Sequence, residues 1–359
     1  MNGRRERNVE QTMNGDSSHG GLPRRQALAR LAALGAGALL PGCAANETAP
    51  ASRLERNKAV VLSFKKAQGT QDEAEVMREV LAPGYKRWRR GMENLAANAR
   101  DQGFPGGGSF LRGAFPDRVD IIEGVIAEGD RVGLLFRLTG THRGNLFGIA
   151  PTGRKVDVYE AAILRVVDGR ITEGWFMADE AGILKQLGAR LPPRRDGKLI
   201  APPITDAGED GDALLARLKA RPAVTREDRN KLVVAASKSS ALPKDTRASG
   251  YKQLRQGLQH MRNYGIAKGT AKFTPTYAFP DRRDHILGLL AEGDTVWMQF
   301  NLRGTHTRSF YGLPPTDRRV EMPEIGIARF VDGKWAEGWY FGDELGILLQ
   351  LGALHMLHG

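Results

Sequence analysis

Cysteine is nearly missing from this chain of 359 residues. Cys43 is the only one, which excludes an internal disulfide and argues against a thiol catalyst. Long apolar runs are missing too, since nothing after residue 45 is apolar enough to span a bilayer. The net charge of +12 comes from scattered Lys and Arg, without a basic run or a basic–aromatic stripe. We therefore expect no nucleic-acid partner and interpret the charge as a basic, solvated surface.

What the chain does have is an internal repeat. Ala114–Ala189 and Ala278–Ala353 align without a gap at an offset of 164, and more than half of the paired positions are identical. This period is far longer than that of a solenoid repeat, so each copy is expected to be a domain. The predicted organisation is a first domain at 52–190, a linker rich in Pro, Asp and Gly at 191–224, and a second domain at 225–355.

Residues 1–50 are interpreted as an export signal and leader. Arg24 and Arg25 precede the Ala/Leu/Gly-rich run Gln26–Leu40, in the manner of a Tat signal. Leu40-Pro41-Gly42-Cys43 resembles a lipobox, which makes Cys43 the lipidation candidate. The expected location is the periplasm or the outer face of the cell membrane, with a lipid anchor as the only membrane contact. The alternative is a disordered tail with an incidental cysteine.

The hydrophobic periodicity changes along each copy from helical to alternating. A capping box at Ser52 opens the first copy, and helical patterns continue through Glu73–Leu81 and Tyr85–Arg100. Alternation then predicts strands, joined by tight Gly-Asp and Asp-Gly turns, at Val119–Ala127, Val132–Thr141, Lys155–Val167 and Ile171–Ala178. Glu180–Leu187 is a predicted closing helix, and Pro323 predicts an edge or bulge in the second copy. The order favours an α+β unit with its helices on one face of a curved antiparallel sheet.

The repeated strands resemble the SnoaL-like polyketide cyclases of the nuclear transport factor 2-like superfamily. The resemblance lies in Gly140-Thr141-His142-Arg143-Gly144, in Pro151–Arg154, in Asp168–Glu173, and in Trp175, Asp179 and Gln186–Gly188. It implies two tandem cone-shaped α+β barrels, each with a ligand cavity between sheet and helices. It also implies ring closure by intramolecular aldol condensation, with an aspartate as acid/base and neither metal nor cofactor.

The resemblance carries the catalytic aspartate over to Asp179 and Asp343. Alternation places Glu173, Trp175, Met177 and Asp179 on one face of their strand, where an apolar surrounding would raise the pKa of the carboxylate toward neutrality. A base of that pKa can take a proton from carbon beside a carbonyl. The alternative is an N-cap role, because both aspartates immediately precede the closing helix.

His142 and His306 end the second strand of each copy. At a cavity rim they would polarise a substrate carbonyl; alternatively, each fixes the loop that follows it. No second histidine or carboxylate stands at ligand spacing in the sequence, so we expect no metal site and no cofactor. Glu160 and Glu324 lie mid-strand in both copies, and if buried each needs a partner.

Eight further side chains are predicted to contact a hydrophobic small-molecule ligand. They are Phe136, Phe147, Trp175, Met177, Phe300, Tyr311, Trp339 and Phe341. For four of them, packing in the core is the common alternative: Phe136, Trp175, Phe300 and Trp339.

Two functions remain open at this stage. One is a cofactor-independent acid–base enzyme; the other is an exported binding or scaffolding protein. In either case the repeats are expected to pair with each other or to support a homodimer. If a single site is active, the first copy is favoured, because the second has Arg308 and Asp317 where the first has loop glycines.

Overall fold

Each repeat is built on a strand meander whose alternation of apolar residues is visible in the sequence. The structure, a computed structural model, describes residues 52–101, 103, 110–191, 208–239, 246–270 and 275–358. The predicted export signal and Cys43 lie outside these residues. Among the described helices, none combines the length and the apolar character needed to cross a bilayer.

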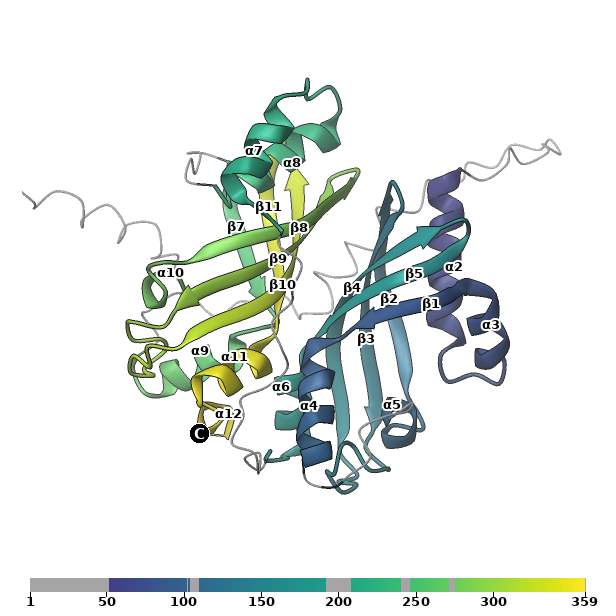
Figure 1. Cartoon of the computed structure of the whole chain (residues 1–359), viewed down its shortest axis with the longest axis vertical. Helices are drawn as coiled ribbons and strands as arrows, with labels where there is room; N and C mark the ends of the chain where they lie inside the picture. Colours follow the sequence, from purple (N-terminus) through teal and green to yellow (C-terminus); the bar gives the residue numbers. More distant parts are fainter. Residues whose placement is uncertain are drawn as a thin grey trace, which may run out of the picture. The chain divides into compact units, whose positions relative to one another are not determined.

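The first repeat folds as a five-stranded mixed sheet in the order β1-β5-β4-β3-β2 (Figure 1). Its antiparallel strands are β2 (Val119–Glu128), β3 (Arg131–Thr141), β4 (Lys155–Val167) and β5 (Arg170–Ala178), which confirms the four predicted strands. The predicted helix Tyr85–Arg100 is wrong in its first part, because Leu81–Trp88 is strand β1, parallel to β5. Only Arg90–Asp101 (α4) is helical. The free edge of β5 and the contact of Tyr85 with Phe64 outweigh the local helical pattern.

The second repeat has the same core sheet with one addition, in the order β6-β8-β9-β10-β11-β7. The strands are β7 (Arg247–Arg255), β8 (Arg283–Glu292), β9 (Thr295–Thr305), β10 (Arg319–Val331) and β11 (Lys334–Gly342). The short strand β6 (Glu209–Asp210) pairs with β8 and leads into helix α7 (Gly211–Lys219). Part of the predicted linker therefore folds onto the second repeat.

Pro323 lies inside β10, which is an inner strand rather than an edge. It pairs with Asn301 of β9, but the ladder with β11 begins only at Glu324. Proline has no N–H to donate, and here it stands just outside the ladder that would need one. The prediction that this strand lies at an edge is therefore wrong. Pro323 nevertheless stands where no N–H is needed for the ladder with β11.

Helices cover one face and one end of each sheet. Along the first sheet lie α2 (Arg53–Ala67) and α3 (Glu73–Val80), and at its lower end in Figure 1 lie α4, α5 (Phe110–Ala114) and α6 (Glu180–Leu187). The second sheet has α7 and α8 (Arg226–Ala236) at its upper end and, toward its lower end and sides, α9 (Gln259–Ala267), α10 (Pro275–Ala278), α11 (Glu344–Leu351) and α12 (His355–His358). The α+β prediction is confirmed.

Three apolar cores hold these layers together. One packs α2 on the first sheet, and a second packs α7 and α8 on the second sheet. The third draws on both repeats at once, joining Leu95 and Leu184 with Met261 and Leu348. The described residues of the two repeats accordingly cluster as one compact unit.

Two hairpin turns link the repeats in a reciprocal manner. Glu128, at the β2–β3 turn, forms an ion pair with Lys231 of α8 and accepts a 2.7 Å hydrogen bond from the backbone N–H of Ala291. Glu292, at the β8–β9 turn, pairs with Lys58 of α2 and accepts a 2.8 Å bond from Ala127 N–H. Each repeat thus uses the same turn glutamate to hold a lysine and a strand end of the other.

We expect Glu128→Ala and Glu292→Ala each to lower the free energy of unfolding by about 1 kcal/mol, because each leaves a backbone N–H of the other repeat without its acceptor and removes an ion pair between the repeats. Urea denaturation would measure the loss. Glu209→Ala is the control, since its partner Arg217 lies in the same repeat and is exposed. Equal effects of all three substitutions would contradict a stabilising role for the cross-repeat bonds.

Candidate functional site

The face of each sheet that is turned toward its helices carries a group of buried charged residues. Cross-strand pairing of Phe136 with Glu160, and of Glu160 with Ala178, places these three side chains on that face of the first sheet. Phe136 packs in the same core as α2, so the face is the inner one, between sheet and helix. Such a face is where the resemblance places a ligand.

Lys65 of α2 reaches onto this inner face. Its Nζ lies 3.3 Å from the centroid of the Phe136 ring and 2.9 Å from Oδ2 of Asp120, which Arg118 also contacts at 2.8 Å. Burial, helped by the charge of Arg118 and opposed by Asp120, lowers the pKa of Lys65 to about 7. Burial alone would raise the pKa of Asp120, but Lys65 and Arg118 hold it below its ordinary value. The result is an amine that exchanges its proton near neutral pH.

The second repeat rebuilds the same group. Lys238 Nζ lies 3.4 Å from the centroid of the Phe300 ring and 2.7 Å from Asp284, which Arg282 contacts at 2.7 Å. Burial lowers the pKa of Lys238, as in the first repeat, and the two cations hold the pKa of Asp284 well below its usual range despite burial. Neither lysine was singled out from the sequence, although the two align at an offset of 173, with Lys65 in the last turn of α2 and Lys238 two residues after the end of α8.

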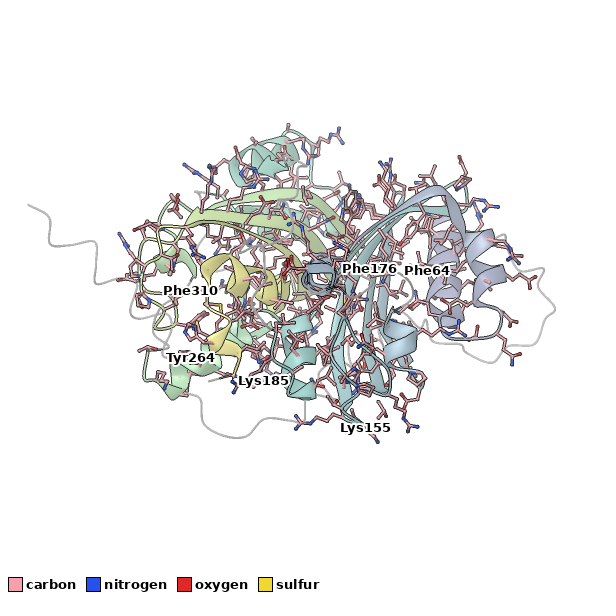
Figure 2. The ribbon with its side chains drawn as sticks, turned by 60° about the horizontal axis from the view of Figure 1, so that its bottom comes forward. Phe64, Lys155, Phe176, Lys185, Tyr264 and Phe310 are labelled. Carbon is pink, nitrogen blue, oxygen red and sulfur yellow. The ribbon has the colours of Figure 1, made fainter. Side chains whose placement is uncertain are left out.

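A pocket of about 280 Å³ opens beside the second group. Its lining consists of Ser237, Lys238, Phe279, Pro280, Arg282 and Asp284. At the position of Ser237 the first repeat has Phe64, whose ring lies 6.5 Å from that of Phe176 (Figure 2). A serine in place of a buried phenylalanine removes most of a ring's volume at this point. The sequence favours the first copy because of its loop glycines, whereas this pocket lies in the second copy.

A second charged group lies deeper on the inner face. Arg89 contacts Glu160 at 2.9 Å and Glu180 at 3.5 Å, and all three side chains are buried. Burial raises the pKa of Glu180 to about 8, although Arg89 opposes the shift. In the second repeat Arg255 contacts Glu324 at 2.6 Å. Both mid-strand glutamates thus have the arginine partner that their burial requires.

Asp179 and Asp343 occupy N-cap positions. Asp179 accepts a 2.7 Å hydrogen bond from Gly182 N–H at the start of α6, and Asp343 accepts a 2.8 Å bond from Gly346 N–H at the start of α11. Burial raises the pKa of Asp343 to about 6, while the Gly346 bond opposes the shift. Capping is therefore present at both positions, and the acid/base role stays a prediction.

His142 and His306 are buried below the loops that follow them. The Nδ1 atom of His142 lies 3.2 Å from Thr152 N–H, from which it accepts a hydrogen bond, and 3.1 Å from Thr152 Oγ1. His306 faces Thr316 Oγ1 at 3.0 Å. Burial lowers the pKa of both rings. These contacts fix the loops, and polarisation of a carbonyl by the histidines stays a prediction.

The predicted ligand-contact residues fall on different surfaces. Phe136 and Phe300 lie on the inner faces beneath the lysines. Phe147 and Tyr311 are buried in the core that the repeats share, each with a positive φ of 50°. Register places Trp175, Met177, Trp339 and Phe341 on the opposite, outer faces. The four outer residues therefore do not line the space between sheet and helices.

The outer faces form a narrow cleft between the repeats. Trp175 and Met177 line it together with Gln299, Asn301 and Pro323 of the second repeat. Its volume is about 20 Å³, which holds about one water molecule. The cleft is too small for an organic substrate.

The family model for SnoaL-like polyketide cyclases matches this sequence twice, over residues 89–187 and 243–351. The chain belongs to this family. Among curated proteins it is 31% identical over 139 residues to the aklanonic acid methyl ester cyclase DauD of Streptomyces sp. (strain C5), covering 37% of this chain and 81% of that protein. It is 32% identical over 128 residues to DnrD of Streptomyces peucetius, a cyclase of the same name, covering 34% and 82%.

Solved structures are similar to part of this chain. A SnoaL-like protein from Jannaschia sp. CCS1 is 26% identical with a TM-score of 0.33, covering 40% of this chain and 99% of its own. The polyketide cyclase IdmH from Streptomyces antibioticus is 27% identical with a TM-score of 0.31, covering 37% and 99%.

The lowered pKa of Lys65 has a consequence for stability. The unfolded chain keeps this lysine protonated up to about pH 10.4, whereas the folded protein releases the proton near 7. Between these values the unfolded state binds more protons, so this residue makes the free energy of unfolding rise with pH by up to about 1.4 kcal/mol per unit. We expect Lys65→Met to remove that slope between pH 7 and 9, as measured by urea denaturation at each pH.

The exposed neighbour on the same helix, Lys66→Met, should keep the wild-type profile. In the Lys65→Met variant Asp120 keeps its hydrogen bonds to Arg118. The change in the pH dependence of the free energy of unfolding therefore reports the lysine rather than an unpaired aspartate. Parallel profiles for wild type and Lys65→Met would disprove the shifted titration.

Proposed function

We propose that this SnoaL-like protein is a cofactor-independent cyclase that closes a ring in a hydrophobic, oxygenated small molecule by intramolecular aldol addition. Family membership supports the reaction class. The observation that carries the proposal for this chain is the pocket of about 280 Å³ in the second repeat, which joins a lysine, an arginine and a phenylalanine. Its size approaches that of ordinary small-molecule sites.

The pocket holds the groups that such a reaction needs. In its deprotonated form, Lys238 takes a proton from the carbon next to a substrate carbonyl, and the electron pair of that C–H bond moves onto the carbonyl oxygen. Arg282 stabilises the enolate charge that develops there. The enolate carbon then bonds to a second carbonyl carbon of the same molecule. The resulting alkoxide takes the proton back from Lys238, so that no oxidant or co-reactant is consumed.

Asp343 is the competing acid/base group in the same repeat. Its buried carboxyl, with a pKa raised to about 6, is chemically suited to the role that the family resemblance gives it. It is placed at the start of α11 and accepts a bond from Gly346, whereas Lys238 lines the pocket. We therefore assign the proton transfer to Lys238 and treat Asp343 as a helix cap.

The pairing of the repeats within one chain belongs to the same proposal. The shared core and the reciprocal turn glutamates support an intramolecular pseudo-dimer in place of a homodimer. Export and a lipid anchor at Cys43 remain predictions from the sequence.

The test uses aklanonic acid methyl ester, the compound named in the relatives' activity, as the probe. Ring closure without loss of atoms yields an isomer of unchanged mass, which chromatography with mass spectrometry separates. We expect Lys238→Met to lower the rate about 100-fold or more, the usual contribution of general acid–base catalysis. Ser237→Phe should abolish binding, because it places the ring of the first repeat in the pocket.

Asp343→Asn separates the two candidates. Asparagine also caps helices, so the variant should fold and retain activity if the aspartate is only a cap. A loss of activity in Asp343→Asn with full activity in Lys238→Met would return the acid/base role to the aspartate. Binding of the probe without turnover by the wild-type protein would instead favour a non-catalytic binding protein.

A further inference from the structure

One cluster of polar side chains lies at the junction of the two repeats, outside the pocket. Asp179 at the start of α6 comes from the first repeat, and His260 of α9 and Glu344 of α11 come from the second. One donor atom from each lies within 4.8 Å of the other two. His260 Nε2 is 3.5 Å from Asp179 Oδ1, which is long for a hydrogen bond. It is close to the separation of two donors bonded to one zinc ion at about 2.1 Å in a tetrahedral arrangement.

Three buried polar atoms of this cluster lack a hydrogen-bond partner in the described part of the chain, while Asp179 Oδ1 accepts the bond from Gly182 N–H. Glu344 is 2% exposed, and its Oε1 accepts a 2.7 Å hydrogen bond from Met261 N–H, but its Oε2 has no hydrogen-bond partner in the described part of the chain. Over the same residues, neither ring nitrogen of His260 makes a hydrogen bond. Buried polar atoms in this state are available to contact an ion or a water molecule.

Comparison with the first repeat shows why Glu344 is different. Its counterpart Glu180 lies 3.5 Å from Nε of Arg89, an ion-pair contact without a hydrogen bond. In the second repeat, Arg255 directs Nε to the carbonyl oxygen of Gly257 at 3.1 Å and its NH2 group to Glu324. Glu344 has therefore lost the arginine that its counterpart keeps.

The histidine is also present in only one of the two repeats. We call the contact of α6 with α9 and α11 one junction, and the corresponding contact of α11 with α4 the other. Alignment of Arg89 with Arg255, and of Leu95 with Met261, places Asn94 at the position of His260. An imidazole nitrogen is a common ligand for divalent metals, and a carboxamide is a weak one. The two changes, loss of an arginine and gain of an imidazole, occur at the same junction.

We propose that Asp179, His260 and Glu344 bind a divalent first-row transition-metal ion, with zinc as the expected occupant. One nitrogen and two carboxylate donors form a set that zinc accepts, and three protein ligands leave a fourth position for water. A bound ion would connect α6 of the first repeat with α9 and α11 of the second. This proposal does not depend on the cyclase activity, because the lysine pocket has its own residues.

The experiment uses the untagged full-length chain, stripped with a chelator and dialysed against ZnCl₂. Elemental analysis should find one zinc ion per chain, and calorimetry gives its affinity. We expect His260→Asn, which introduces the residue of the other junction, to weaken zinc binding about 100-fold or more. Glu344→Gln, which keeps the shape of the side chain, should have a similar effect.

His285→Asn is the control, because His285 lies on β8 outside the cluster and should leave zinc binding unchanged. Circular dichroism in the presence of chelator checks that each variant is folded. A wild-type protein without stoichiometric zinc, or a folded His260→Asn variant with wild-type affinity, would overturn the proposal. A failure of the zinc experiment leaves turnover of the cyclase probe unaffected, so the two proposals can be separated.

Discussion

The buried ion pair of Arg89 with Glu160 is the interaction on which the architecture of the first repeat depends. It joins the residue between β1 and α4 to the middle of β4, and the same guanidinium reaches Glu180 at the start of α6. Removing one partner of a buried pair leaves a charge without compensation, which is strongly destabilising. Three elements that are far apart in sequence are therefore held to one geometry. That geometry positions the inner face and the helix caps.

The residues that the repeats share serve this framework in large part. Asp117 accepts a 2.7 Å hydrogen bond from Thr141 N–H, and Gln186 bonds both the N–H and the carbonyl oxygen of Asp157. Gly188 ends α6 in the left-handed conformation with φ 64°. Identity between copies thus marks turns, caps and loop anchors as well as chemistry. The residues that are identical in the two repeats therefore tell more about the fold than about the reaction.

Period-two alternation predicts β2 to β5 to within a residue or two, because each strand has one face against helices and the other against a second sheet. Strand β1 could not be found this way, since its pairing with β5 depends on a partner about 90 residues later. The inner lysines were missed for a related reason. Lys65 looks like an ordinary polar position of α2, and only the placement of Asp120 and Phe136 opposite it makes it a buried amine. His260 and Asp179 are likewise brought together only by the packing of two repeats.

The change from Phe64 to Ser237 shows how small a difference separates a filled inner face from an open one. Both repeats keep the lysine, the aspartate and the aromatic ring beneath them. The electrostatic arrangement is therefore common to both. Access differs, because one side chain in the helix is large and the other is small.

The covalent joining of the two repeats has a further consequence. In a homodimer of one domain, every substitution appears twice across the two-fold axis, so the two junctions must remain identical. A tandem chain is free of that constraint. One junction can carry Asn94 beside an arginine-bound glutamate while the other carries His260 beside a glutamate without one. Duplication followed by fusion thus allows an asymmetric protein to arise within a symmetric framework, with a different chemical task on each side of the former axis.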